Sequence, residues 1–326
     1  MRLVITANGF QKPEMKPVLE KARACFDSVV VNPWGRRGTQ EEIRQIWDGA
    51  DAIICGAELF DKSLLDDAPA TLKVISRYGV GLDNIDISAC KAKGIQVCNT
   101  PGANADSVAE MAMCLMLACA RQLVNHDGHT RRGEWKRFSC MELKGKRLGL
   151  VGFGAIGRGV ARRARAFGME VVAYDPYFNM AAAEELNVSK ATWEELLLSS
   201  DVISLHLPAT AATWHLVNAE ALAQMKPNAI LVNTARGELI DEEALACALR
   251  EGRLGAAGLD VYEHEPLRES PLFALENVTL TPHCSATTPE ASLNMGMMAV
   301  ENACQTLGNH SCGRVPPSPR GVADGT

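Results

Sequence analysis

Short apolar segments rich in β-branched residues alternate with helix-compatible segments along most of the chain. A first series of such segments begins near residues 2, 28, 51, 72 and 95, and a second begins near residues 147, 170, 201, 228, 256 and 277. Strands that alternate with helices are joined by crossover connections and form parallel sheets. The pattern therefore predicts an α/β protein with two doubly wound parallel sheets, one formed by each series.

The chain length indicates two domains, because 326 residues exceed what a single hydrophobic core usually supports. An apolar helix is expected over residues 106–123, between the two series. A second helix, over residues 289–307, is expected to return to the first sheet. We therefore predict a discontinuous domain of residues 1–102 plus 286–315, and a domain of residues 103–285 inserted into it. Residues 316–326 are expected to form a mobile tail rich in Pro and Gly.

The charge of the chain favours a small-molecule partner. Its formal net charge is −6 and its pI is near 5.7, so it offers no basic surface for nucleic acid or anionic lipid. The most apolar stretch, residues 108–119, contains Glu110 and is shorter than the roughly 20 residues that a bilayer requires. The N-terminus lacks the pattern of a signal peptide. We expect a soluble, cytoplasmic protein, with no membrane or nucleic-acid partner.

A glycine-rich motif follows the first strand of the second series. The apolar segment 148–151 leads directly into Gly152, Gly154 and Gly157 in G-x-G-x-x-G spacing, and a helix-compatible segment comes next. In such a motif the glycines allow a tight turn, a close approach of pyrophosphate to the backbone, and close packing of helix on strand. The free N–H groups of the helix N-terminus then face the phosphates. This pattern predicts a Rossmann-type dinucleotide site.

An acidic residue closes the next strand. Asp175 lies 18 positions after Gly157, where a carboxylate accepts hydrogen bonds from the adenosine ribose. A 2′-phosphate would meet that negative charge, so NAD is expected as the cofactor in preference to NADP. The alternative is that Asp175 is an ordinary turn residue before Pro176.

Three later strands end in ionisable residues, at the edge where open α/β sheets bind ligands. They are Arg236, the pair Glu263 and Glu265, and His283. Arginine, glutamate and histidine side chains suit the tasks of binding an anion, orienting an imidazole and transferring a proton. Taken singly, each also fits a surface ion pair, a loop residue or a solvated carboxylate. No metal site is predicted.

The motifs identify a family. The chain resembles the D-isomer-specific 2-hydroxyacid dehydrogenases, and within them the phosphoglycerate dehydrogenase branch. The resemblance rests on segments that occur in the family's order: RYGVGLDNID at 77–86, NTPGANADSVAE at 99–110, GFGAIG, YDP, LHLP, VNTARGELID, GLDVYEHEP and TPH. It implies a Rossmann-type NAD domain inserted in a flavodoxin-like substrate domain, and a homodimer built on the helix at 106–123.

The resemblance also implies residue roles. Arg236 would bind the substrate carboxylate and polarise its carbonyl, His283 would be the general acid and base, and Glu265 would orient His283. Further positions would contact the cofactor, namely Asp260 at the nicotinamide carboxamide, Ala235, His206 and Pro208 along the groove, and Ile156 through its backbone N–H. Others would contact the substrate, namely the amides of Val80 and Gly81 together with Asn104.

The substrate is less clearly indicated. A 3-phosphoglycerate-like substrate is expected first, with the alternatives of a glyoxylate or hydroxypyruvate (glycerate) reductase and of a dehydrogenase for another substituted 2-keto acid. Phosphoglycerate dehydrogenases have an arginine after the third strand, where this chain has Glu58. Arg77 or the basic segment 136–137 would then contact the distal end of the substrate. The alternative from another functional class is a non-catalytic regulator that senses NAD.

Overall fold

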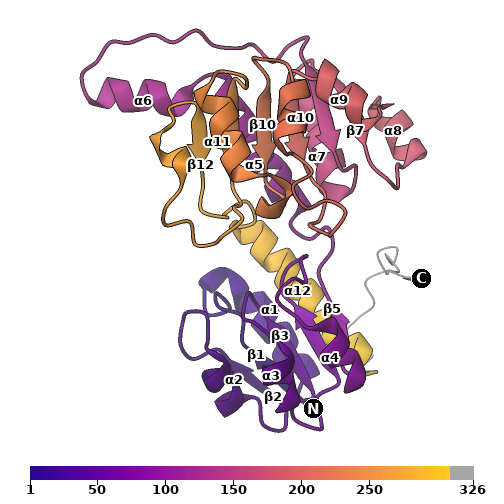
Figure 1. The fold of residues 1–326 in the computed structure, drawn as a ribbon. Coiled ribbons are helices and arrows are strands. Elements are labelled where there is room, and N and C mark those ends of the chain that lie inside the picture. Colours follow the sequence, from indigo (N-terminus) through magenta and orange to yellow (C-terminus); the bar gives the residue numbers. More distant parts are fainter. Residues whose placement is uncertain (309–326) are drawn as a thin grey trace. The chain divides into compact units, whose positions relative to one another are not determined.

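The computed structural model describes residues 1–308 and divides the chain into two compact units (Figure 1). The first unit contains Met1–Asn104 together with the described residues from Pro289 to residue 308, and the second unit is Ala105–Thr288. The predicted tail at 316–326, and residues 309–315 of the predicted discontinuous domain, lie outside the described residues. The two units are described separately below.

The first unit contains a five-stranded parallel sheet with the order β2-β1-β3-β4-β5. Its strands are β1 (Arg2–Ile5), β2 (Ser28–Val31), β3 (Ala52–Cys55), β4 (Val74–Arg77) and β5 (Gln96–Cys98). Alternate residues of a strand point to opposite faces, so Leu3 and Ile5 belong to one hydrophobic cluster and Val4 to another. Both faces of the sheet are therefore buried.

Helices cover the two faces of this sheet. The first cluster includes residues of the short helix η1 (Pro13–Met15), of α1 (Lys16–Cys25) and of α12 (Pro289–Thr306). The second cluster contains residues of α2 (Gln40–Ile46), α3 (Lys62–Asp66) and α4 (Ile87–Ala92). The last described helix of the chain thus packs on the first sheet, as the sequence predicts.

The second unit contains a seven-stranded parallel sheet with the order β12-β11-β10-β9-β6-β7-β8. Its strands are β6 (Arg147–Val151), β7 (Glu170–Tyr174), β8 (Ser189–Lys190), β9 (Val202–Leu205), β10 (Ile230–Asn233), β11 (Ala256–Leu259) and β12 (Val278–Leu280). The chain runs outward from β6 in one direction and returns to its other side at β9. This change of direction makes the carboxyl end of β6 a topological switch point, where such sheets bind ligands.

Helices also cover both faces of the second sheet (Figure 1). One cluster contains residues of α5 (Ala105–Ala120), α7 (Ala155–Ala166) and α8 (Met180–Leu186). The other contains residues of α9 (Trp193–Ser199), α10 (Ala219–Gln224) and α11 (Glu242–Arg250), and of the short helices η2 (Gly237–Leu239) and η3 (Pro271–Ala274). The prediction of two parallel-sheet α/β domains is confirmed.

Two local features differ from the sequence prediction. The helix expected over 106–123 ends at Ala120, and Gln122 adopts a left-handed conformation with φ of 46° before α6 (Leu123–Arg131) begins. The helix α6 has mixed polar and apolar residues without a clear apolar stripe, so periodicity did not indicate it. The strand β8 has only two residues, too few to show an alternating pattern.

No single helix among residues 1–308 is both long and apolar enough to cross a membrane. The helices α5 and α6 reach the required length and composition only as a pair, and the pair is bent by 61°.

Asp201 joins three segments at the amino-terminal edge of the second sheet. Its Oδ2 accepts a hydrogen bond from the N–H of Arg147 at 2.8 Å, and its Oδ1 accepts one from Lys226 Nζ at 2.9 Å. Burial acts to raise the pKa of Asp201, but these contacts outweigh it and hold the pKa below its ordinary value. The ionised form therefore stabilises the fold.

We predict that Asp201→Asn lowers the free energy of unfolding by about 1–2 kcal/mol at pH 7. Because the folded-state pKa is lowered, this stabilisation is fully present above the ordinary pKa of an aspartate and is lost as the pH falls through the folded value. The difference in unfolding free energy between the parent and the variant should therefore become smaller below about pH 4. Urea unfolding at several pH values measures it, with Glu185→Gln on the surface of α8 as the control. A difference that stays constant with pH would contradict the prediction.

Candidate active site

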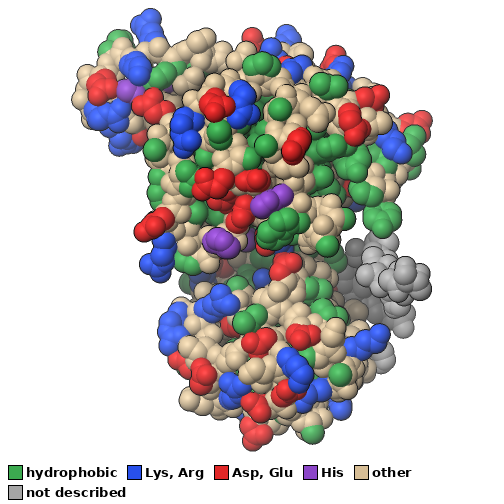
Figure 2. Space-filling model, in the orientation of Figure 1, with side chains coloured by type: hydrophobic (Ala, Val, Ile, Leu, Met, Phe, Trp, Pro, Cys, Tyr) green, Lys and Arg blue, Asp and Glu red, His purple; other side chains and the backbone are tan. Residues whose placement is uncertain are grey.

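The candidate residues of the second unit all follow the carboxyl ends of its strands. Because the strands are parallel, these ends meet at one edge of the sheet. Figure 2 shows histidine and acidic side chains next to one another on the surface of this unit. In the order of the strands that precede them, the candidate residues are Gly152 after β6, Asp175 after β7, His206 after β9, Arg236 after β10, Asp260 after β11 and His283 after β12.

The glycine loop fits a bound dinucleotide. A Cβ on Gly152 would lie 2.7 Å from the carbonyl carbon and oxygen of His206, and one on Gly157 would lie 2.2 Å from the Gly152 carbonyl oxygen. At Gly154 no atom lies within 4 Å of the Cβ position. The loop is thus packed against protein at two glycines and open at the third, where pyrophosphate needs space.

The helix α7 begins at this open position, with Gly154 as its N-cap. Its first backbone hydrogen bond runs from the Arg158 N–H to the Gly154 carbonyl oxygen at 3.0 Å. The N–H groups of Ala155, Ile156 and Gly157 precede this bond and have no acceptor within the helix. These donors, at the positive end of the helix dipole, suit the phosphates of NAD.

Asp175 holds the same loop from the neighbouring strand. Its Oδ2 accepts a hydrogen bond from the Phe153 N–H at 2.6 Å, and its Oδ1 accepts one from the Tyr177 N–H at 2.7 Å. Each carboxylate oxygen can accept a second bond. The residue therefore has both a structural contact with the glycine loop and free acceptor capacity for ribose hydroxyls.

His206 is neutral at physiological pH. Burial lowers its pKa to about 3, and its Nε2 lies 3.0 Å from the Ser204 hydroxyl. The backbone of His206 is the surface on which Gly152 packs, so this residue lines the groove beside the glycine loop. Pro208, two residues later, accepts a hydrogen bond from the Thr213 hydroxyl at 2.8 Å through its carbonyl oxygen.

The loop that carries Arg236 is packed against the loop after β11. A Cβ on Gly237 would lie 1.9 Å from the Tyr262 carbonyl carbon, so only glycine permits this contact. Within the Arg236 loop, the Asn233 side chain donates to the Arg236 carbonyl oxygen at 2.8 Å and accepts from the Ala235 N–H at 3.0 Å. The Arg236 Nη1 donates to the Ala235 carbonyl oxygen at 2.7 Å. These contacts bind the Arg236 carbonyl oxygen and its guanidinium to neighbouring residues of the same loop.

His283 and Glu265 form a pair. The His283 Nδ1 lies 2.7 Å from Glu265 Oε2, and about half of the histidine side chain is exposed. Because Nδ1 is bound to a carboxylate, Nε2 is the ring nitrogen that can exchange a proton with a ligand. Nε2 has no hydrogen-bond partner among residues 1–308. A histidine held in this way can donate a proton to a ligand and take it back.

Glu263 is committed to other contacts. It exchanges two hydrogen bonds with Glu242, because each residue donates its backbone N–H to the other's Oε1, at 2.8 and 3.2 Å. The His215 Nε2 also lies 3.0 Å from Glu263 Oε1. The geometry therefore favours Glu265 over Glu263 as the partner of His283.

The buried side chain of Asp260 binds the His283 loop. Its Oδ1 accepts from the Thr281 hydroxyl at 2.6 Å and from the Cys284 N–H at 2.9 Å. Its Oδ2 accepts from the Ser285 N–H at 2.9 Å and from the Ser285 hydroxyl. Burial acts to raise the pKa of Asp260, but these hydrogen bonds hold it below its ordinary value. The carboxylate thus lies among the residues that flank His283.

Tyr262, for which the sequence predicted no role, makes further hydrogen bonds in this site. Its hydroxyl donates to the carbonyl oxygens of Thr281 at 2.8 Å and Leu259 at 3.2 Å, and its N–H donates to Glu265 Oε1 at 3.2 Å. Burial raises the pKa of Tyr262 to about 12, so the hydroxyl remains a donor. One residue therefore contacts both the glutamate and the histidine loop.

The three remaining candidates lie in the first unit. Val80 and Gly81 follow β4, and the Val80 carbonyl oxygen accepts a hydrogen bond from the Asn99 side chain at 2.6 Å. Gly79, just before them, exchanges bonds with Thr100 at 3.0 and 3.1 Å. Asn104 is the last residue before α5, and its Oδ1 is buried without a partner among residues 1–308.

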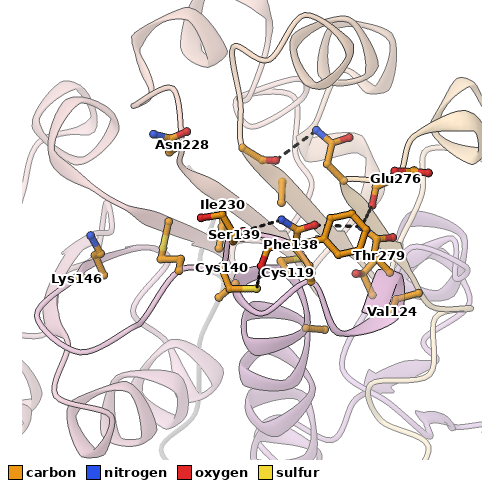
Figure 3. A pocket seen from close by; sticks show the side chains of 18 residues that line it. Cys119, Val124, Phe138, Ser139, Cys140, Lys146, Asn228, Ile230, Glu276 and Thr279 are labelled. Carbon is orange, nitrogen blue, oxygen red and sulfur yellow. Dashed lines mark hydrogen bonds between the residues drawn. The ribbon is translucent and has the colours of Figure 1, made fainter. Parts of the chain in front are cut away.

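A cavity of about 650 Å³ lies away from all of these residues (Figure 3). It is lined by the end of α5, by the segment around Phe138 and by residues that precede strands, among them Lys146 and Asn228. It is thus at the amino-terminal edge of the second sheet, and none of the candidate residues lines it.

The family is shown by comparison with known proteins. Residues 113–285 match the family model described as "D-isomer specific 2-hydroxyacid dehydrogenase, NAD binding domain". The chain is 43% identical over 288 residues to a glyoxylate reductase of Thermococcus litoralis, with 85% of this chain and 84% of that protein covered. It is 45% identical over 274 residues to a hydroxypyruvate reductase of Thermotoga maritima, with 82% and 89% covered.

A D-3-phosphoglycerate dehydrogenase of Methanocaldococcus jannaschii is also 45% identical, over 272 residues. Here 82% of this chain is covered but only 52% of the relative. Among solved structures, a glyoxylate reductase from Paecilomyes thermophila matches with a TM-score of 0.83 and 32% identity, covering 93% of this chain and 94% of that one. The chain therefore belongs to the D-isomer-specific 2-hydroxyacid dehydrogenases, which are NAD-dependent oxidoreductases that act on the CH–OH group of their donors.

Proposed function

We propose that this enzyme reduces a small 2-keto acid with His283 as the general acid, Glu265 as the residue that orients it and Arg236 as the substrate's cationic partner. The 2.7 Å contact between His283 Nδ1 and Glu265 Oε2 carries the proposal. It fixes the ring at one nitrogen and leaves the other for a substrate carbonyl. The reverse reaction uses the same groups, with His283 as the base.

The second unit holds the cofactor in this proposal. The amide groups of Ile156 and its neighbours bind the pyrophosphate, Asp175 binds the adenosine ribose, and Ala235, His206 and Pro208 line the groove. Bound NADH supplies the hydride that reduces the carbonyl carbon. A neutral His206 suits this groove because it adds no charge next to the cofactor.

The protein groups supply the remaining chemistry. The His283 Nε2 proton passes to the carbonyl oxygen as that oxygen gains negative charge, and the imidazole is left neutral. The Arg236 guanidinium pairs with the substrate carboxylate and draws electron density from the carbonyl. The first unit adds substrate contacts through the amides of Val80 and Gly81 and through Asn104.

Hydroxypyruvate and glyoxylate are the substrates best supported. Relatives named for these two acids are 43% and 45% identical to this chain, and Glu58 stands where the sequence comparison above places an arginine in phosphoglycerate dehydrogenases. The 3-phosphoglycerate-like substrate that the sequence suggested first thus becomes the alternative, and both belong to one assay panel. We place the enzyme in the cytoplasm, because free buried thiols such as those of Cys55, Cys90 and Cys119 suit a reducing compartment.

The second unit also supports a homodimer. A groove on α5, α6 and α7 is lined by apolar side chains, including Leu117, Leu123 and Phe167. Leu123 is 61% exposed and Phe167 is 46% exposed. A contiguous apolar groove on a monomer is typical of an interface. A second copy of the chain, contacting this groove through its own, fits a two-fold symmetric dimer.

The catalytic roles predict a graded loss of activity. His283→Gln should lower kcat for hydroxypyruvate by about 10²- to 10⁴-fold, since the proton donor is lost. Glu265→Gln should lower it less, by roughly 10- to 100-fold, because the ring remains but is no longer held by a charge. Both should bind NADH like the parent, measured by fluorescence. Glu263→Gln is the matched control and should retain most of kcat. Equal losses for Glu263→Gln and Glu265→Gln would contradict the assignment.

The proposed dimer predicts that a charged substitution in the groove lowers the molecular mass of the protein in solution. Leu123→Glu places a charge in the apolar groove, so light scattering after gel filtration should show a monomer in place of the parent dimer. Leu198→Glu on α9 is the control, because Leu198 is also 61% exposed but lies outside the groove. A parent that is itself a monomer, or two variants of unchanged mass, would exclude this interface.

A further inference from the structure

The first unit has a buried acidic side chain at the carboxyl edge of its sheet. Glu58 follows β3 by three residues and is only 1% exposed. Its Oε2 accepts a hydrogen bond from the Gly56 N–H at 2.6 Å and lies 3.4 Å from the Thr6 hydroxyl. Its Oε1 is buried with no hydrogen-bond partner among residues 1–308. Within the described part of the chain, one amide and one hydroxyl, and no cation, therefore contact this carboxyl group.

The loop that carries Glu58 is held in place independently of it. The Asn84 side chain donates to the carbonyl oxygens of Gly56 at 3.1 Å and Glu58 at 2.6 Å. The Phe60 N–H donates to the Asn84 carbonyl oxygen at 2.8 Å. These bonds involve backbone atoms at Glu58, so a change of its side chain leaves them intact.

Arg77 lies on the neighbouring strand. It ends β4, and its Cα is the register partner of Cys55 at the end of β3. Its guanidinium lies over the Gly79 turn, because a Cβ on Gly79 would be 2.7 Å from Arg77 Nη1. Gly79 has φ of 141°, which also favours glycine. The guanidinium is therefore beside the segment that leads into Val80 and Gly81.

The charges of Glu58 and Arg77 both affect Cys55, at the end of β3. Burial raises the pKa of the Cys55 thiol to about 12, with the charge of Arg77 acting to lower it and the charge of Glu58 acting to raise it. Glu58 and Arg77 thus lie within electrostatic range of the same strand end. The interior of a protein screens charge poorly, so a buried carboxylate acts over a longer distance than an exposed one.

These positions bear on which substrate the first unit accepts. A 2-keto acid with an uncharged third carbon brings one negative charge, whereas its phosphate ester adds a charge of about −1.5 to −2. Arg77 would attract the phosphate, but Glu58 offsets that attraction and repels the added charge. We propose that Glu58 makes this enzyme discriminate against phosphorylated 2-keto acids in favour of hydroxypyruvate. This inference rests on the proposed 2-keto acid reductase function and names the residue that selects its substrate.

The test compares two acids that differ only in the phosphate. The ratio of kcat/KM for 3-phosphohydroxypyruvate to kcat/KM for hydroxypyruvate is measured for the parent, for Glu58→Gln and for Glu58→Met. Glutamine keeps an acceptor for the Gly56 N–H, and methionine has a similar volume without polar atoms, so at least one variant is expected to fold. Circular dichroism and the Tm confirm the fold. Glu20→Gln on the surface of α1 is the control for a change of net charge.

We expect the parent to prefer hydroxypyruvate. In either folded Glu58 variant the ratio should rise at least tenfold through a lower KM for the phosphorylated acid, with kcat for hydroxypyruvate within threefold of the parent. A parent that prefers phosphohydroxypyruvate, or a ratio unchanged in a folded variant, would overturn the inference and leave the reductase function standing. A parent that reduces none of the 2-keto acids would overturn the proposed function, and this inference with it.

Discussion

The buried carboxylate of Asp260 is the interaction on which the candidate active site depends. It follows β11 and accepts bonds from residues on both sides of His283, which follows β12. His283 itself has φ of 50°, a left-handed conformation that a non-glycine residue adopts only when its neighbours are fixed. Hydrogen bonds from Thr281, Cys284 and Ser285 to one ionised side chain supply that constraint. The proton donor His283 is therefore positioned by the buried Asp260 as well as by Glu265.

At this edge of the sheet, residues of the same type that are close in sequence have different roles, some catalytic and some structural. Glu263 and Glu265 are two residues apart, yet one is bound to Glu242 and the other to His283. Gly237 brings the arginine loop against Tyr262, and Tyr262 in turn bonds to Glu265 and Thr281. The loops after β10, β11 and β12 thus form one bonded unit. Displacing any of them would move the cation, the anion or the proton donor.

Much of this arrangement was predictable from the sequence because it depends on local patterns. Strand and helix periodicity gave both sheets, and the spacing of Gly152, Gly154 and Gly157 after a strand gave the dinucleotide loop. Contacts between segments distant in sequence were not predictable. The ties that Asp260 makes to Thr281 and Ser285 depend on β11 and β12 being neighbours, and no local pattern encodes that pairing. Burial of Glu58 was not predictable for the same reason, since its environment includes Thr6, which follows β1 and is distant in sequence.

The most direct test of this account is the effect of Asp260→Asn on catalysis and on cofactor binding, measured separately. If Asp260 acts by holding the His283 loop, kcat for the keto acid should fall by about 10²-fold or more, while the Kd for NADH stays within threefold of the parent value. If Asp260 acts mainly as a contact to the nicotinamide, NADH binding should weaken by tenfold or more with a much smaller change in kcat. The first result would support the account, and the second would contradict it.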